Sequence, residues 1–181
     1  KFNKLSQICE PFKNGSTPKE GNFSKSGVLY YRSQDFDLFE LKETQYITEE
    51  FNSQIKRSEV KVNDIMLAVV GATLGKIGFI NDEKKEGNIN QNVARIRLSS
   101  NEYLPKFLAL FLSTEMGQKQ IKRNATITTQ AYLNNEVLGN ILIPYVSIKE
   151  QEKVIETFNK TTLQKQTNEA EAEKLLASIN D

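Results

Sequence analysis

The chain has 181 residues, of which 38% are hydrophobic and 26% are charged, and its formal net charge is +1. These values are typical of a soluble globular protein with a buried core. No apolar run in the sequence is long enough to cross a bilayer. The absence of histidine excludes Ser-His-Asp and Cys-His triads and histidine-ligated metal sites. The single cysteine, Cys9, excludes an internal disulfide and a zinc cluster, so we expect a reduced, cytoplasmic setting.

The N-terminal part of the chain predicts short strands separated by turns. Residues 13–23, KNGSTPKEGNF, contain Asn-Gly, Thr-Pro and a further glycine, a composition typical of turns. Residues 27–32, GVLYYR, are rich in aromatic and β-favouring residues and predict a strand. We interpret its Tyr30 and Tyr31 as core residues. A threonine followed by two glutamates at positions 48–50 predicts the capped start of a short helix.

The middle of the chain contains a glycine-rich loop between two apolar runs. Residues 63–70, NDIMLAVV, predict a buried strand, and residues 69–80, VVGATLGKIGFI, predict a strand, a loop and a second strand. The Gly-Lys pair is followed by isoleucine, so the loop fits neither a nucleotide P-loop nor a dinucleotide fingerprint. Thr73 and Lys76 near its tip suit contact with a phosphate. The alternative is a plain hairpin with a solvated lysine, which the local sequence alone favours.

The next two segments differ in hydrophobic period. Residues 93–98, VARIRL, alternate between apolar residues and arginine, which predicts a half-buried strand with Arg95 and Arg97 on one face. From Leu104 onwards, apolar residues recur with a helical period, which predicts one amphipathic helix to about Lys122.

The C-terminal part predicts a single long helix and a boundary between two domains. Ser147 and Glu150 form a capping box, and neither Pro nor Gly follows to the end of the chain. We therefore expect domains at residues 1–146 and 147–181. The long helix has a broken apolar stripe that favours pairing with another helix in a coiled coil; the alternative is an exposed helix packed at one end only. The residues expected at the dimerisation face are Val154, Ile155, Phe158, Leu163, Leu175, Leu176 and Ile179.

Taken in order, several stretches resemble the specificity subunit of type I restriction-modification systems. The resemblance covers nearly the whole chain and depends on the order of the stretches, since none is specific alone. The stretches are KLSQICEPFKNGSTPKEGNF, VLYYRSQDF, YITEEFNSQIKRSEVKVNDIMLAVVGATLGKIGFI, NQNVARIRL, FLALFLSTEMGQKQI and TTQAYLNNEVLGNILIPYVSIKEQEKVIETF.

The resemblance implies a mixed α+β fold. In it, a small twisted β-sheet target recognition domain with packed helices precedes a long C-terminal helix that forms an antiparallel coiled coil. It also implies a non-catalytic component that reads one half-site of double-stranded DNA and docks methyltransferase subunits through the long helix. Such subunits carry two recognition domains and two spacer helices, whereas this chain holds one of each. A half-subunit, a fragment or the recognition tail of a fused adenine methyltransferase-endonuclease would fit, and an assembly module that does not bind DNA stays an alternative.

The resemblance implies further partners and no cofactor in this chain. We expect S-adenosylmethionine, ATP and Mg²⁺ in partner subunits, which include the methyltransferase and a restriction or motor subunit. The long helix would pair with a second copy in a homodimer, or with a second recognition domain. No group of residues has the spacing of a catalytic or metal site, so none is predicted.

Candidate DNA contacts follow from side-chain chemistry on strand ends and polar loops. Glutamine pairs with adenine and arginine or lysine with guanine, whereas lysine and hydroxyl groups suit phosphates. The net charge is small, so affinity for DNA must come from local groups of cations, for which scattered surface charge is the alternative. The expected base contacts are Arg32, Ser33, Gln34 and Gln130. The expected phosphate contacts are Lys13, Lys19, Thr73, Lys76, Lys84 and Lys85.

Overall fold

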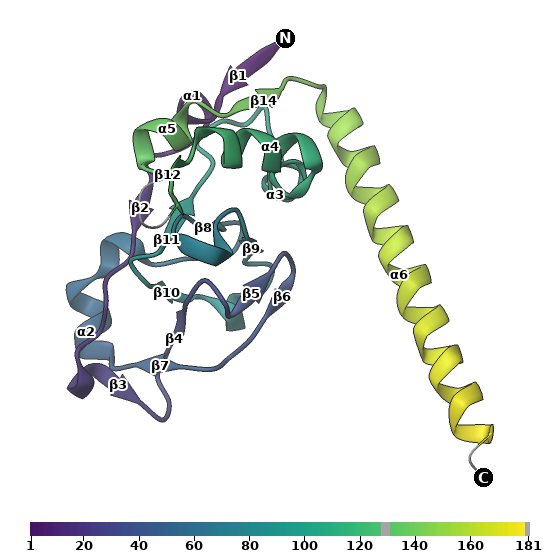
Figure 1. Ribbon diagram of the computed structural model, residues 1–181, viewed down its shortest axis with the longest axis horizontal. Helices are drawn as coiled ribbons and strands as arrows, with labels where there is room; N and C mark the ends of the chain where they lie inside the picture. The colour runs from purple at the N-terminus through teal and green to yellow at the C-terminus, as the bar shows by residue number, and fades with distance from the viewer. Residues whose placement is uncertain (128–130, 180–181) are drawn as a thin grey trace. The chain divides into compact units, whose positions relative to one another are not determined.

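A computed structural model describes residues 1–127 and 131–179 of the chain (Figure 1). The chain divides into two compact units, residues 1–145 and 146–181. The division lies one residue before the boundary expected from the capping box. The first unit contains strands and short helices, and the second is a single long helix.

In the described residues, the strands of the first unit form two four-stranded sheets and three two-stranded sheets. One four-stranded sheet has the order β10-β4-β7-β3, and its β10 and β4 are parallel. The other has the order β2-β11-β8-β9 and is antiparallel throughout. The strands of the first are Gly87–Ile89, Val28–Tyr31, Tyr46–Ile47 and Phe23–Ser24, and those of the second are Lys13–Asn14, Val93–Ile96, Ile65–Ala68 and Ile77–Phe79.

Short pairs of strands and short helices complete the first unit and confirm the mixed α+β class. The strand pairs are β1 with β14 (Phe2–Lys4, Leu142–Pro144), β5 with β6 (Phe36–Asp37, Glu40–Leu41) and β12 with β13 (Thr126–Ile127, Ala131–Tyr132). The α-helices are α1 Leu5–Ile8, α2 Glu49–Gln54, α3 Pro105–Ser113, α4 Glu115–Asn124 and α5 Asn135–Gly139. The 3-10 helices are η1 Glu20–Asn22, η2 Lys56–Ser58, η3 Gly71–Thr73 and η4 Glu83–Lys85.

One cluster of the core lies between the two four-stranded sheets. Leu29 and Tyr31 of β4 pack there with Met66 and Ala68 of β8, because alternate residues of a strand share one face. Tyr30 points to the opposite face of β4, where it packs against residues of β7 and α2. Both tyrosines are buried, as expected. Their hydroxyls donate hydrogen bonds to backbone carbonyls, so each buried polar end has a partner.

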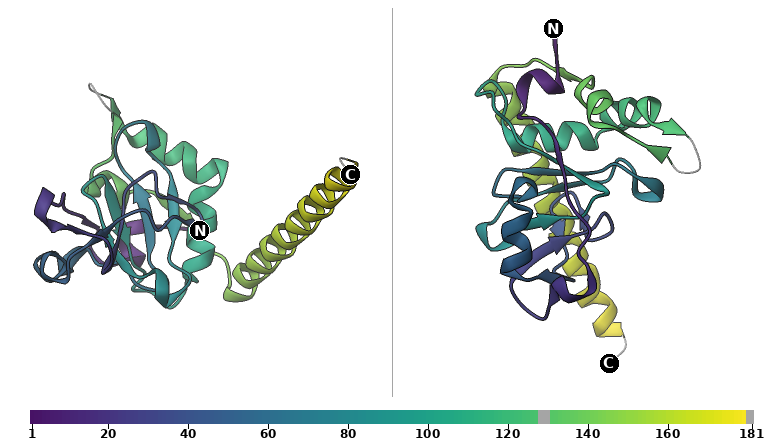
Figure 2. Two further views of the ribbon diagram at one scale, coloured as in Figure 1. Left: turned by 90° about the horizontal axis from the view of Figure 1, so that it is seen from below. Right: turned by 90° about the vertical axis from the view of Figure 1, so that its left-hand side faces the viewer.

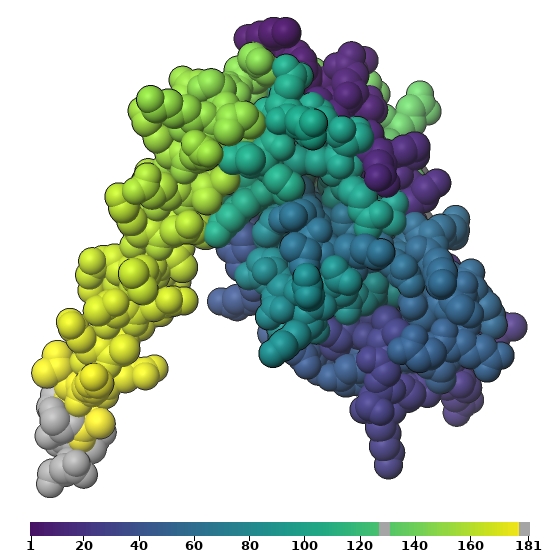
Figure 3. All heavy atoms as spheres, turned by 180° about the vertical axis from the view of Figure 1, so that it is seen from behind, coloured from purple at the N-terminus to yellow at the C-terminus, as the bar shows by residue number. Residues whose placement is uncertain are grey.

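Helices α1, α3, α4 and α5 gather at one end of the first unit, as Figure 1 and the right-hand view of Figure 2 both show. There β1 pairs with β14, which brings the N-terminus beside the end of the unit. The space-filling view shows the same closeness on the surface, where purple N-terminal residues lie next to green residues that precede the long helix (Figure 3).

Two expectations were wrong in detail. Residues of β11 are buried on both faces, and Arg95 is only 7% exposed, because β11 is a central strand with β2 and β8 on either side. The predicted single helix from Leu104 is two helices, α3 and α4. The chain is extended at Thr114, whose hydroxyl caps α4 by accepting a hydrogen bond from the Gly117 amide.

The second unit is helix α6, Ile148–Ile179. The predicted capping box is confirmed, because Ser147 and Glu150 exchange hydrogen bonds between side chain and backbone. Among the predicted dimerisation residues, Val154, Leu163, Leu175 and Leu176 are between 46% and 66% exposed. The side chain of Ile179 lies outside the described residues. None of the helices that the structure describes combines the length and apolarity needed to span a membrane.

Candidate nucleic-acid interface

Several loops of the first unit leave the two sheets at the same edge. The parallel strands β4 and β10 end side by side, and the Asn90 amide donates to the Tyr31 carbonyl at 3.0 Å. Strand β8 ends there too, because the Val69 amide donates to the Asn92 carbonyl at 2.9 Å. We call this edge the turn edge. It comprises residues 15–17, 32–35, 71–76 and 90–92.

The turn after β4 is held by an ion pair within it. The Asp35 amide donates to the Arg32 carbonyl at 2.9 Å, which closes a turn with Ser33 and Gln34 at its centre. The Asp35 carboxylate accepts hydrogen bonds from the Arg32 amide, Nε and Nη2 at 2.8–2.9 Å. Burial alone would raise the pKa of Asp35, but hydrogen bonds from Arg32 and Thr44 outweigh it and lower that pKa.

This ion pair separates the roles of the predicted base contacts. Nη2 of Arg32 also donates to the Thr44 hydroxyl at 3.2 Å, so three of its five N–H donors are already used within the chain. Ser33 is 9% exposed, whereas Gln34 is exposed at the tip. Base contact by Arg32 stays a prediction, and the geometry favours Gln34.

The glycine-rich loop between β8 and β9 is the predicted strand–loop–strand, and it is anchored to α4. Gly71 and Gly75 have φ of +72° and +92°, which glycine adopts without steric cost. The Gln118 amide nitrogen donates to the Gly75 carbonyl at 2.8 Å. A Cβ at Gly75 would stand 2.6 Å from Gln118 Oε1. The loop therefore has one defined position against the helix.

A cleft of about 430 Å³ opens beside this loop. Thr73 and Lys76 line it together with Asp37, Ser113, Gln118 and Lys122. Lys76 Nζ lies 4.0 Å from an Asp37 oxygen, and Lys122 on α4 is exposed. Two lysines and one carboxylate leave the cleft with an excess of positive charge, which suits a single phosphate group. Lys122 was not among the predicted contacts, because sequence reasoning assigned it only to the end of a helix.

The remaining predicted cations do not join this cleft. Lys84 and Lys85 precede β10, whereas the turn edge begins where β10 ends, so they lie at opposite ends of that strand. Lys85 also forms an ion pair with Glu43. Lys13 lies in β2 opposite Arg95, and Lys19 is exposed where η1 begins. Gln130 lies outside the described residues.

The turn that follows β10 was missed as a site in the sequence, where NQN was assigned to the start of the next strand. The Val93 amide donates to the Asn90 carbonyl at 3.0 Å, which places Gln91 and Asn92 at the centre of a turn. Gln91 is exposed. The signal available in the sequence was three amide residues, NQN, directly before a buried strand, and asparagine favours turns.

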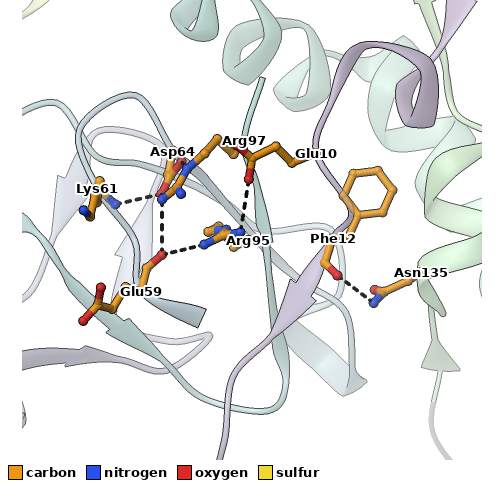
Figure 4. Close-up of polar contacts among 8 residues, drawn as sticks. All are labelled: Glu10, Phe12, Glu59, Lys61, Asp64, Arg95, Arg97 and Asn135. Atoms are coloured by element: carbon orange, nitrogen blue, oxygen red, sulfur yellow. Dashed lines mark hydrogen bonds and ion pairs between the residues drawn. The ribbon is translucent and has the colours of Figure 1, made fainter. Parts of the chain in front are cut away.

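Two arginines that look like DNA contacts are instead part of the fold (Figure 4). Arg97 donates to both oxygens of Asp64 at 2.6 and 2.7 Å, and these hydrogen bonds raise the pKa of Arg97. Arg95 Nη1 donates to the Glu59 carbonyl at 3.1 Å, and burial lowers the pKa of Arg95. Asp64 is 1% exposed, so this cluster holds β8 and β11 together rather than facing a ligand.

The turn edge carries groups for recognition. Amides at turn tips can exchange hydrogen bonds with base edges, and the lysine cleft can hold a phosphate. Within the part of the chain that the structure describes, no three His, Cys, Asp or Glu residues are placed to bind a metal ion.

Comparison with known proteins gives a consistent result. The family model described as "Type I restriction modification DNA specificity domain" matches residues 1–180. The chain is similar to the type I restriction enzyme EcoBI specificity subunit of Escherichia coli, with 29% identity over 163 residues. That alignment covers 89% of this chain and 34% of the relative, so the chain spans about a third of the relative's length.

Solved structures share the fold. One is a chain from a structure that describes complex assembly and conformational transition of the type I R-M system. It superposes with a TM-score of 0.74 and 17% identity, and the match covers 96% of this chain and 41% of that one. The S subunit from M. genitalium superposes with a TM-score of 0.64 and 17% identity, and the match covers 88% of this chain and 38% of that one. The HsdS subunit from Thermoanaerobacter tengcongensis superposes with a TM-score of 0.67 and 15% identity, and the match covers 91% of this chain and 37% of that one.

Proposed function

The chain belongs to the family of type I restriction-modification DNA specificity domains, and on that premise we propose that it reads one half-site of a double-stranded DNA target through the turn edge. Members of this family supply specificity and are not catalytic. The observation that carries the proposal is the convergence of separate polar turns and a lysine cleft at one edge of two packed sheets.

Within this proposal, bases and phosphates are contacted by different parts of the turn edge. Gln34 reads a base edge in the major groove, and Arg32 holds the turn that presents it. Thr73, Lys76 and Lys122 hold one backbone phosphate in the cleft beside the glycine-rich loop. Phosphate contacts by Lys13 and Lys19 are part of the same proposal, as is base contact by Ser33 and Gln130. Lys84 and Lys85 lie at the other end of β10, so their phosphate contacts would contribute less.

The remaining activities of the system belong to other subunits in this proposal. Methylation of adenine with S-adenosylmethionine would occur in methyltransferase subunits, and DNA cleavage with ATP and Mg²⁺ in a restriction or motor subunit. Helix α6 would dock the methyltransferase and set the distance to a second half-site. The target is cellular DNA, so the chain would act in the cytoplasm.

The sequence of α6 supports an antiparallel pair with a second copy. Ile155 and Phe158 are three heptads before Leu176 and Ile179. A two-fold axis at Thr167 would place Phe158 opposite Leu176, and Ile155 opposite Ile179, at both ends of the pair. The same axis would place Lys165 opposite Glu169, and Thr162 opposite Ala172, in the middle. Apolar layers would then close the ends, and opposite charges would match at the centre.

Selection from randomised duplexes tests the DNA proposal. We expect the chain, assembled with methyltransferase subunits if binding requires them, to enrich a preferred sequence with strongly salt-dependent affinity. Gln34→Ala should relax one position of that preference by about fivefold to a hundredfold. Gln54→Ala, which removes an exposed glutamine at the end of α2, is the matched control. Absence of any preference in the wild-type complex would favour the assembly-only alternative.

Charge exchange on α6 tests the antiparallel pair. Lys165→Glu and Glu169→Lys should each shift the monomer–dimer equilibrium towards monomer, since each places like charges in the central layers, and the double exchange should restore the dimer. The control is Glu156→Lys, which breaks the 2.8 Å pair with Lys160 on a different heptad position of the same helix. Sedimentation equilibrium measures all four. A dimer unchanged by both single exchanges contradicts this register.

A further inference from the structure

We propose that Gln91 is a second base-reading side chain and that Thr17 is the residue that positions it. This inference rests on the proposed function and identifies a specificity determinant that the sequence did not indicate. Two features of the structure carry it: the rigid turn on which Gln91 stands, and a hydrogen bond from a segment 74 residues away.

The backbone around Gln91 is fixed by several hydrogen bonds. The Asn90 side chain accepts from the Asn92 amide at 2.7 Å, and the Asn90 carbonyl accepts from the Val93 amide at 3.0 Å. The Asn14 side chain donates to the Gln91 carbonyl at 3.4 Å. The side chain of Gln91 nevertheless projects into solvent. The backbone that carries the exposed Gln91 side chain is therefore held in place, and a fixed backbone is one requirement for precise hydrogen bonding to a ligand.

The turn formed by GSTP, residues 15–18, brings a hydroxyl to this side chain. Gly15 passes so close to β10 that a Cβ would stand 1.7 Å from the Ile89 carbonyl oxygen, so only glycine fits there. The Ser16 amide donates to the same carbonyl at 3.3 Å, and the Ser16 carbonyl accepts from the Tyr30 hydroxyl at 2.7 Å. The Thr17 hydroxyl then donates to Gln91 Oε1.

That hydrogen bond orients the amide more than it stabilises the fold. Both side chains are exposed, so water competes for the contact and its net effect on folding is small. With the Thr17 hydroxyl on Oε1, the Gln91 amide retains one lone pair on Oε1 and both Nε2 hydrogens for further hydrogen bonds. An acceptor and a donor side by side match N6–H and N7 of adenine in the major groove. The chemistry therefore points to an A·T base pair as the target of Gln91.

The position of Gln91 fits a role beside Gln34. Their turns begin at the neighbouring ends of β4 and β10, which are linked by the Asn90–Tyr31 hydrogen bond. Adjacent strands lie about 4.8 Å apart, and successive base pairs about 3.4 Å. Two glutamines on adjacent turns can therefore reach bases that are close together in one half-site.

Selection from randomised duplexes separates this inference from the proposed function. Gln91→Ala should lose about tenfold or more of the discrimination for A·T at one position and keep the preference at the others. Thr17→Val, which removes only the hydroxyl, should weaken discrimination at that same position about threefold to tenfold. Thr17→Ser retains the hydroxyl and should behave as the wild type. Gln54→Ala again serves as the control, and unchanged thermal unfolding of Thr17→Val shows that the turn is intact.

Each contrary outcome has a separate meaning. Full preference at every position in Gln91→Ala, with a sequence-specific wild type, overturns the inference and leaves the proposed function standing. Equal weakening of all sequences by Gln91→Ala overturns base reading in favour of a backbone contact. A Thr17→Val variant that matches the wild type overturns the positioning role of Thr17. A wild type without any preference overturns the proposed function itself.

Discussion

Polar side chains in the first unit occupy two contrasting environments, the buried interior and the turn edge. In the interior, Asp64 and Asn88 are 1% and 0% exposed, and each makes several hydrogen bonds to side chains and backbone. At the turn edge, Gln34 and Gln91 are exposed at the tips of turns. Interior polar groups must be paired because unpaired ones destabilise the fold. Exposed ones contribute little to folding and are available for a ligand.

The largest expected effect comes from the interior. Asp64→Ala removes the acceptor of two Arg97 hydrogen bonds and of the Lys61 amide. Loss of one partner of a buried pair typically costs about 3–5 kcal/mol. Because the Arg97 side chain is 28% exposed, we expect the lower end, about 3 kcal/mol, or roughly 6–12 °C in Tm.

Thermal unfolding followed by circular dichroism measures this effect. Asp82→Ala is the matched control, because Asp82 is exposed and caps only the short η4 helix. Its expected cost is about 1 kcal/mol or less. Equal Tm values for the two variants would remove the distinction between buried and exposed carboxylates.

A smaller effect concerns DNA affinity rather than stability, and it compares a lysine of the turn edge with a lysine at the opposite end of β10. Lys76→Ala should weaken binding several-fold for all sequences and reduce the slope of log affinity against log salt by about one. Lys84→Ala removes an exposed lysine from the other end of β10. If the turn edge faces DNA, Lys84→Ala should have the weaker effect in the same titration. The reverse ranking would move the interface to the opposite end of the strand.

The smallest effect concerns pH and the turn that carries Gln34. The pKa of Asp35 is lowered in the folded chain, so its ionised form stabilises the fold above about pH 4, and that contribution is lost as pH falls through the lowered pKa. Asp35→Asn should therefore be less stable than the wild type at pH 7. The difference should disappear as pH falls through the lowered pKa of Asp35. Urea unfolding at a series of pH values from 7 downwards measures it, and a gap that stays constant as pH falls contradicts this origin.

Local patterns predicted much of this fold. The buried strand β8, the Thr48 cap of α2 and the Ser147–Glu150 box that starts α6 are each set by residues within one or two turns of each other. The residues that determine each of these elements are neighbours in the sequence, so the local pattern is enough to predict the element. The order of such segments was also sufficient to indicate the family.

Other features depend on contacts that no local pattern encodes. Alternation in β11 indicated an exposed arginine face, but β11 is a central strand, and the carboxylate that pairs with Arg97 lies 33 residues away in sequence. The single helix expected from Leu104 to about Lys122 is interrupted at Thr114, which is extended and caps α4, and the apolar period before it did not indicate this break. Gln91 was missed since its partner, Thr17, is in another segment of the turn edge.

The close approach of Gly15 to β10 has a consequence for change of specificity. At that position any side chain would collide with the Ile89 carbonyl, so Gly15 tolerates no substitution. In contrast, Gln34 and Gln91 are exposed at the tips of their turns, and replacing them disturbs no core contact. If Gln34 and Gln91 read bases as proposed, the preferred DNA sequence can change through these two positions while the fold stays the same. A search for a new target sequence would then keep Gly15 and randomise positions 34 and 91.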